Sequence, residues 1–90
     1  MKGKTKSGFK YEVSDKATRD MELLDAIAKL LNGDWTASET AIIHLIGASG
    51  KTALYDHCRD EDGIADRDLV YQEITEIMVA MSNNSETKNS

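Results

Sequence analysis

The sequence predicts an all-α protein, a small bundle of four helices preceded by a short extended segment. Three observations predict it: apolar residues recur at helical spacing in four stretches, period-two alternation occurs only near the N-terminus, and Gly-containing turns separate the stretches. With 90 residues, 40% of them apolar and 30% charged, the chain has the length and mixture of one globular domain. A chain of this size has little room for a deep substrate pocket beside its core.

The extended segment covers Phe9–Val13, where apolar and charged residues alternate. This pattern predicts a short strand, or an extended arm packed on the helices. No second stretch shows the same alternation, so the sequence provides no strand partner, and an unpaired strand invites another chain to pair with it. The preceding residues 1–8 carry Lys2, Lys4 and Lys6 and are predicted to be a flexible basic arm.

The first helix is predicted over residues 15–31. Its main apolar stripe is Ala17, Met21, Leu24, Ala28 and Leu31, and Leu23, Ile27 and Leu30 widen that stripe. Ser14 or Asp15 is expected to cap its start, and Asn32-Gly33 its end.

A capping box, Thr36-Ala37-Ser38-Glu39, predicts the start of a second helix running to about residue 46, where Gly47 ends it. Ser49 is expected to cap a short third helix, which ends before an acidic turn at residues 60–63. A fourth helix is expected after Asp66. Residues 9–81 thus form the single helical domain, and the polar residues 82–90 are predicted to be a disordered tail.

Charge and composition bear on function. Residues 9–81 contain seven Lys or Arg against fifteen Asp or Glu, which disfavours a nucleic-acid face. No stretch is long enough and apolar enough to cross a membrane. A single cysteine, Cys58, and the lack of a signal-peptide pattern predict a cytoplasmic protein.

Three motifs resemble phosphate-, calcium- or zinc-binding sites, but each lacks residues that such a site requires. Gly47–Thr52 ends like a phosphate-binding loop, but Leu45 stands where the first glycine is required and no strand leads in. Asp60–Asp66 resembles part of a calcium loop, yet Cys58 and Leu69 occupy its first and last ligand positions. Two histidines and one cysteine are fewer ligands than a zinc site needs. We therefore expect no catalytic residues, no cofactor and no metal.

Trp35 lies in the connection between the first two predicted helices. A large aromatic side chain there either plugs the end of the core or stands exposed as a binding anchor. The candidate protein-binding residues are Phe9, Tyr11 and Trp35, with Leu23 and Leu30 of the first helix.

Residues 8–13, 21–28 and 53–63 resemble the small tail assembly chaperones of long-tailed bacteriophages and prophages of Gram-positive bacteria. The most specific part is Leu-Tyr-Asp-His followed by Arg-Asp-Glu-Asp-Gly, and the likeness covers roughly residues 8–80. Gly47–Thr52 and Ile64–Arg67 depart from the family pattern, which expects a leucine-rich helix end and a proline-containing link there.

The resemblance implies a non-enzymatic protein of the bacterial cytoplasm. Such a protein binds the hydrophobic tape-measure protein, keeps it soluble and recruits major tail protein subunits around it. Helices with broad apolar stripes suit this role, because one helix can then serve both the domain's core and a partner helix. We also expect homo-oligomers.

The alternative is a small prophage regulator whose second and third helices form a helix-turn-helix, although the helix that would read bases carries only Lys51 and, at its end, Arg59.

Overall fold

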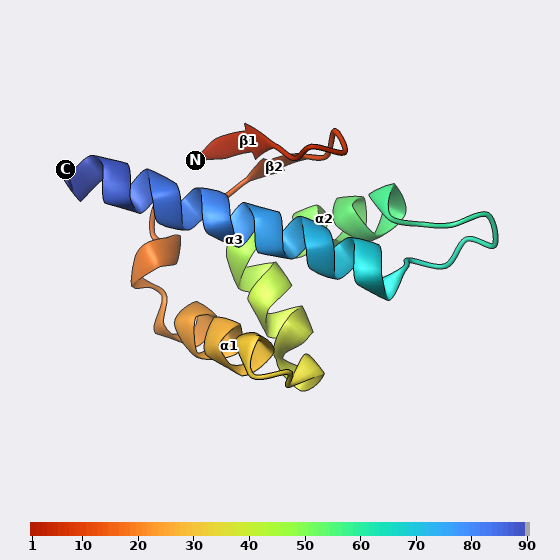
Figure 1. The fold of residues 1–90 in the computed structure, drawn as a ribbon, viewed down its shortest axis with the longest axis horizontal. Coiled ribbons are helices and arrows are strands. Elements are labelled where there is room, and N and C mark those ends of the chain that lie inside the picture. Colours follow the sequence, from red (N-terminus) through yellow and green to blue (C-terminus); the bar gives the residue numbers. More distant parts are fainter. Residues whose placement is uncertain (90) are drawn as a thin grey trace.

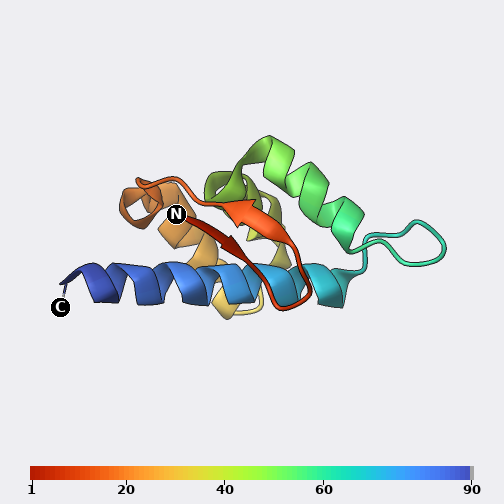
Figure 2. The same cartoon turned by 90° about the horizontal axis from the view of Figure 1, so that it is seen from above.

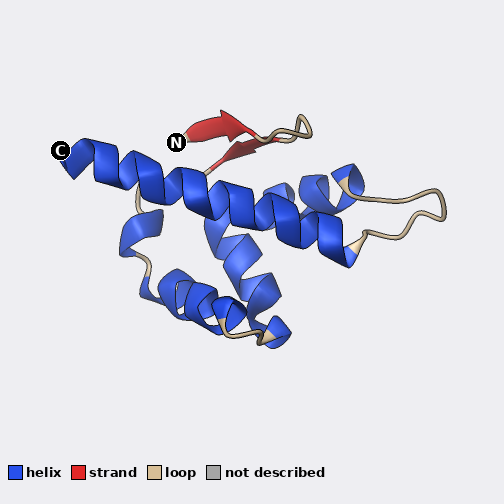
Figure 3. Cartoon of the chain, viewed as in Figure 1, coloured by secondary structure: helices blue, strands red, loops and turns tan. Residues whose placement is uncertain are grey.

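The protein consists of an N-terminal β-hairpin packed on three α-helices (Figures 1 and 3). This computed structural model describes the backbone of residues 1–89 and the side chains of residues 1–83. The elements run in the order β1 (Lys2–Lys4), β2 (Lys10–Glu12), a 3₁₀ turn η1 (Ala17–Arg19), α1 (Met21–Leu31), a second 3₁₀ turn η2 (Trp35–Ala37), α2 (Ser38–His57) and α3 (Arg67–Asn89).

The expected bundle of four helices is wrong in its count, since the described residues form three α-helices. The predicted second and third helices are the two arms of one element, α2. Gly47 alone interrupts them, with φ +82° and ψ +167°, and helical geometry continues on both sides without a connecting loop. Ser49 therefore lies inside α2 and caps nothing. A side chain at Gly47 would strain this backbone, so glycine fixes the position of the bend.

The predicted basic arm is part of the fold. Lys2–Lys4 pairs antiparallel with Lys10–Glu12 and provides the partner strand that the sequence pattern did not reveal. Gly3 and Tyr11 lie opposite each other, and a β-carbon on Gly3 would come within 2.4 Å of the Tyr11 hydroxyl oxygen. The hairpin closes because glycine leaves room for that ring. Viewed from above, the hairpin lies between the second arm of α2 and α3 (Figure 2).

The first helix is shorter than expected. Its N-cap is Asp20, whose carboxylate accepts a hydrogen bond from the Leu23 backbone NH at 3.1 Å, and residues 17–19 form a separate 3₁₀ turn. The predicted caps Ser14 and Asp15 therefore lie outside it. At the other end, Asn32 and Gly33, with φ +84°, terminate the helix as predicted.

The predicted capping box does not form. Asp34 accepts hydrogen bonds from both the backbone NH and the hydroxyl of Thr36, which starts the turn η2 instead. Glu39 points elsewhere and binds the Lys51 ammonium at 2.7 Å across the bend of α2. An aspartate two residues upstream has therefore displaced the expected threonine cap.

The last helix begins as predicted, since Asp66 accepts a hydrogen bond from the Leu69 NH at 2.9 Å. Its end differs from the prediction, because α3 continues to Asn89 and passes Ser82, where we expected a disordered tail to begin. Ser90 lies outside the described residues. Among the described residues, no helix is both long and apolar enough to cross a bilayer.

The core lies where the hairpin, α1 and both arms of α2 meet the middle of α3. Its largest fully buried side chains are Leu23, Ile42, Leu45, Leu54, Ile77, Val13 and Cys58. Cys58 is a small residue buried in this core, and burial raises the pKa of its thiol. Two polar residues are also buried, Thr5 and Glu73, and they bind each other through a hydrogen bond of 2.9 Å.

Candidate protein-binding surface

Helix α1 carries two apolar stripes that face in different directions. The inner stripe is Leu23, Ala26 and Leu30, all buried against α2 and the rest of the core. The outer stripe is Met21, Leu24, Ala28 and Leu31, all exposed. Successive residues of a helix turn by about 100°, so the half-buried Ile27 joins the two stripes into one apolar sector that covers more than half of the circumference.

The outer stripe exposes more than scattered surface leucines do. Met21 is 64% exposed, Leu24 41% and Leu31 71%. These residues recur at steps of three and four, so their side chains line one face of the helix. An apolar face of this kind on a small chain is typical of a surface that a partner covers.

The N-terminal cap sets which stripe faces inward. Asp20 holds the first turn through the Leu23 NH, and its other oxygen lies 2.8 Å from His44 Nδ1 on α2. The carboxylate thereby ties the start of α1 to the middle of α2 and brings Leu23 onto the core. Leu23 and Leu30 were the predicted contact residues of this helix, whereas the structure buries them and exposes Met21, Leu24, Ala28 and Leu31 instead.

The His44–Asp20 pair makes stability depend on pH. Its hydrogen bond raises the pKa of His44 above 6.5 and lowers that of Asp20 below 3.8, and both side chains are about 30% exposed. The contribution of His44 is complete below about pH 6.5 and is lost as pH rises through its raised pKa. The contribution of Asp20 is present above about pH 4 and is lost as pH falls through its lowered pKa.

We therefore expect wild type to be more stable than His44→Gln by a margin that is largest between about pH 4 and 6.5 and shrinks toward pH 9. Urea unfolding of both proteins across this range measures the margin. Asp25→Asn serves as a control for an exposed charge on the same helix. A margin that is constant up to pH 9 would contradict the assigned ion pair.

The five predicted contact residues divide between the core and the surface. Phe9 (5% exposed), Leu23 (0%) and Leu30 (5%) are buried, so each offers little surface to a partner. Tyr11 is half-buried beneath the hairpin against Gly3, and burial raises the pKa of its hydroxyl. Only Trp35 is well exposed, at 47%. The exposed apolar residues of α1 are Met21, Leu24, Ala28 and Leu31, none of which was predicted as a contact residue.

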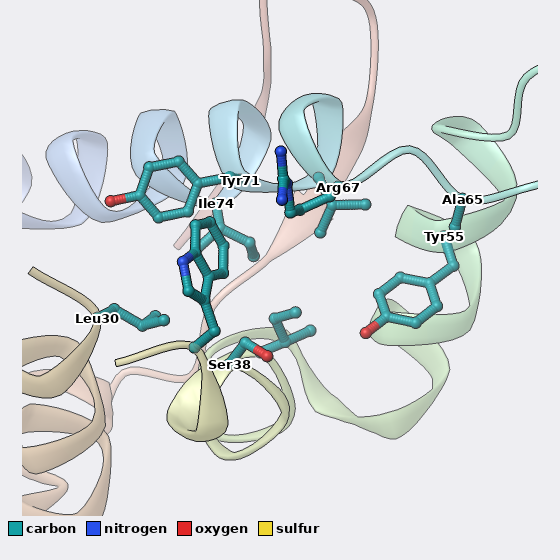
Figure 4. A pocket seen from close by; sticks show the side chains of 10 residues that line it. Leu30, Ser38, Tyr55, Ala65, Arg67, Tyr71 and Ile74 are labelled. Carbon is teal, nitrogen blue, oxygen red and sulfur yellow. The ribbon is translucent and has the colours of Figure 1, made fainter. Parts of the chain in front are cut away.

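Trp35 lines a pocket between η2, α2 and α3. Figure 4 shows Tyr55 of α2 and Tyr71 and Ile74 of α3 around the same pocket. Its ring packs on Tyr71 with centroids 4.8 Å apart and the planes tilted by 55°. The pocket holds about 240 Å³, and its apolar walls include Leu30, Ile42 and Ile74, with Tyr55 also lining it. Trp35 is therefore neither a plug in the core nor a free anchor; it forms one wall of a shallow apolar pocket.

A polar cluster ties the hairpin turn to the helices. The buried Glu73 carboxylate accepts hydrogen bonds from the hydroxyls of Thr5 and Ser7, and Ser7 Oγ lies 2.9 Å from His57 Nε2. A serine, a histidine and a carboxylate also make up hydrolase triads, but there the acid and the serine contact opposite ring nitrogens. Here Glu73 lies 3.5 Å from the same Nε2 that faces Ser7. The cluster therefore fastens the hairpin and lacks the arrangement of a triad.

The motifs that resembled nucleotide or metal sites have local structural partners. Lys51, the cationic residue of the Gly47–Thr52 motif, binds Glu39. Asp60 accepts hydrogen bonds from the backbone NH groups of Asp62 and Ile64, and Asp66 caps α3. Within residues 1–83, no group of three or more His, Cys, Asp or Glu side chains is placed to hold a metal ion.

Comparisons with family models, with curated proteins and with solved structures give no significant match to this chain.

Proposed function

We propose that this chain is a tail assembly chaperone of a long-tailed phage or prophage, and that it binds amphipathic helices of the tape-measure protein through the outer stripe of α1. The observation that carries the proposal is the exposed row of Met21, Leu24, Ala28 and Leu31 on a helix whose other side is already buried. A partner helix that covers this row would remove apolar area from water without unfolding the chaperone.

The charge of the chain supports the same role. A net charge of −5 keeps a complex with an apolar client soluble. In this proposal the protein is non-enzymatic and acts in the cytoplasm of the bacterial host, where it also recruits major tail protein subunits.

The surface charges favour this proposal over a DNA-binding regulator. The two cations of the arm that would read bases are engaged, Lys51 with Glu39 and Arg59 with Asp56 at 2.9 Å. Phosphate contacts would need both cations and a basic surrounding surface. The same arm joins the first arm of α2 through the single non-helical residue Gly47, whereas a turn of about three or four residues joins the two helices of a helix-turn-helix.

Co-expression with the tape-measure product of the same gene cluster tests the proposal. We expect the client to be soluble with wild type and to return to the pellet with the double variant Leu24→Ser/Leu31→Ser. The substitutions place hydroxyls where apolar contacts would form, and both sites are exposed, so the fold is retained. Val79→Ser is the matched control, because Val79 is a 53% exposed apolar residue on α3.

Two results would refute the proposal. One is a client that is equally soluble with and without this chain. The other is a double variant that keeps the client soluble as well as wild type does while circular dichroism shows that the variant is folded.

A further inference from the structure

The outer face of the hairpin carries like charges that no side chain among residues 1–83 neutralises. The strand register places Lys4 directly opposite Lys10, whereas Lys2 lies opposite Glu12 and pairs with it at 3.5 Å. Like charges directly opposite each other destabilise a strand pair. Among residues 1–83, no carboxylate lies within ion-pair distance of Lys4 or Lys10. An acidic group from another molecule would relieve this repulsion.

A groove runs beside these lysines. It lies between the hairpin and the second arm of α2, measures about 410 Å³ and is shallow. Its apolar lining comes from Phe9, Tyr11, Ile46 and Ala53. Lys2, Lys10 and Glu12 also line it, and Glu12 is already paired with Lys2, which leaves Lys10 as the lining cation without an ion-pair partner among residues 1–83. Such a groove suits a segment that presents an apolar side chain next to carboxylates.

The chain itself carries a segment of this chemistry in the loop between α2 and α3, residues 59–66. Ile64 of this loop is 60% exposed, and the neighbouring Glu61 and Asp62 are exposed as well. The loop projects from one end of the molecule, away from the hairpin (Figures 1 and 2). It therefore lies beyond reach of the groove in its own chain.

The loop is also held in one conformation. Arg59 donates a hydrogen bond to the Gly63 carbonyl at 2.9 Å, and Asp60 accepts the NH groups of Asp62 and Ile64. The Asp60 NH binds the Ile64 carbonyl at 2.9 Å, and Arg59 and Ala65 form an antiparallel bridge. A segment that is ordered before binding loses less conformational entropy when it docks.

We propose that the 59–66 loop of one copy docks in the hairpin groove of a second copy, with Ile64 against the apolar lining and the acidic residues beside Lys4 and Lys10. Groove and loop lie on different parts of the surface, so the contact is head-to-tail and leaves a free groove and a free loop at the ends of each assembly. The outer stripe of α1 takes no part in it. The inference is thus independent of the proposed function, and either can fail without the other.

Sedimentation equilibrium over a range of protein concentrations tests the inference. We expect wild type to self-associate, and Lys10→Glu and Asp62→Lys each to weaken the association constant by about tenfold or more, because a reversed charge repels its partner. Ile64→Ser is expected to weaken association as well. All three side chains are exposed, and circular dichroism verifies that the variants are folded.

A mixing experiment makes the test specific. Lys10→Glu retains a native loop and Asp62→Lys retains a native groove, so an equimolar mixture is expected to associate although each variant alone is weakened. Lys16→Glu and Asp25→Lys are the matched controls, with the same charge changes at exposed sites away from both surfaces. The controls should associate as wild type does.

Four results would overturn the inference. The first is a wild type that stays monomeric at every concentration. The second is a loss of association in the control variants that equals the loss in the test variants. The third is a mixture that gains nothing over its components. The fourth is a hairpin face that binds a nucleic acid or an unrelated acidic peptide while wild type remains monomeric.

Discussion

Replacing Leu23 by alanine is expected to lower the free energy of unfolding by about 2–5 kcal/mol, the range for a leucine truncated in a packed core. Leu23 is 0% exposed and belongs to the inner stripe of α1. A small domain has about 5–15 kcal/mol of stability in total, so this variant should unfold at a much lower urea concentration.

The adjacent residue supplies the control for this prediction. Leu24 is 41% exposed on the outer stripe, and Leu24→Ala should change the free energy of unfolding by no more than about 0.5 kcal/mol. Urea unfolding followed by circular dichroism measures both variants. Equal losses at the two positions would mean that both stripes are buried, and the outer stripe would then be unavailable to a partner.

Replacing Gly47 by alanine is expected to cost about 1–3 kcal/mol, because φ +82° with ψ +167° is a conformation that only glycine adopts readily. No atom lies within 4 Å of the position that an added β-carbon would take, so the cost comes from backbone strain and not from a clash. The bend would straighten or the strain would persist. Straightening would move the second arm of α2 relative to the hairpin, whereas persisting strain would leave the arm in place and lower the stability.

Ser49→Ala is the control for Gly47→Ala. Ser49 is exposed on the same arm, and its replacement should leave stability within about 0.5 kcal/mol of wild type. If Gly47→Ala were as stable as wild type, Gly47 would have ordinary helical dihedrals and α2 would be a straight helix.

The helical class, the end of α1 and the start of α3 could be predicted from the sequence, because each has a local signal. Asn32-Gly33 and Asp66 are residues whose own chemistry ends or begins a helix. The direction in which α1 faces could not be predicted. Both stripes have helical spacing, and the choice between them depends on Asp20, which caps the helix and binds a histidine 24 residues away.

Strand β1 was missed for a physical reason. Lysine and glycine have low strand propensity. In this segment exposed lysines alternate with Gly3 and the buried Thr5, so the inward-facing residues are not the apolar ones that mark a strand in a sequence. Thr5 is buried because it binds Glu73, which lies 68 residues further along the chain. The candidate contact residues Phe9, Leu23 and Leu30 were chosen for apolar character, and apolar character alone does not separate a core side chain from a binding one.

The most direct test of the account is a methyl NMR titration of the protein with an amphipathic helix taken from the tape-measure protein of the same gene cluster. The account predicts saturable shifts of the Met21, Leu24, Ala28 and Leu31 methyl groups, with the methyl groups of Leu23 and Leu54 changing little. If those four signals stay in place while the helix binds elsewhere, or if no signal moves at all, the outer stripe of α1 is not the client site.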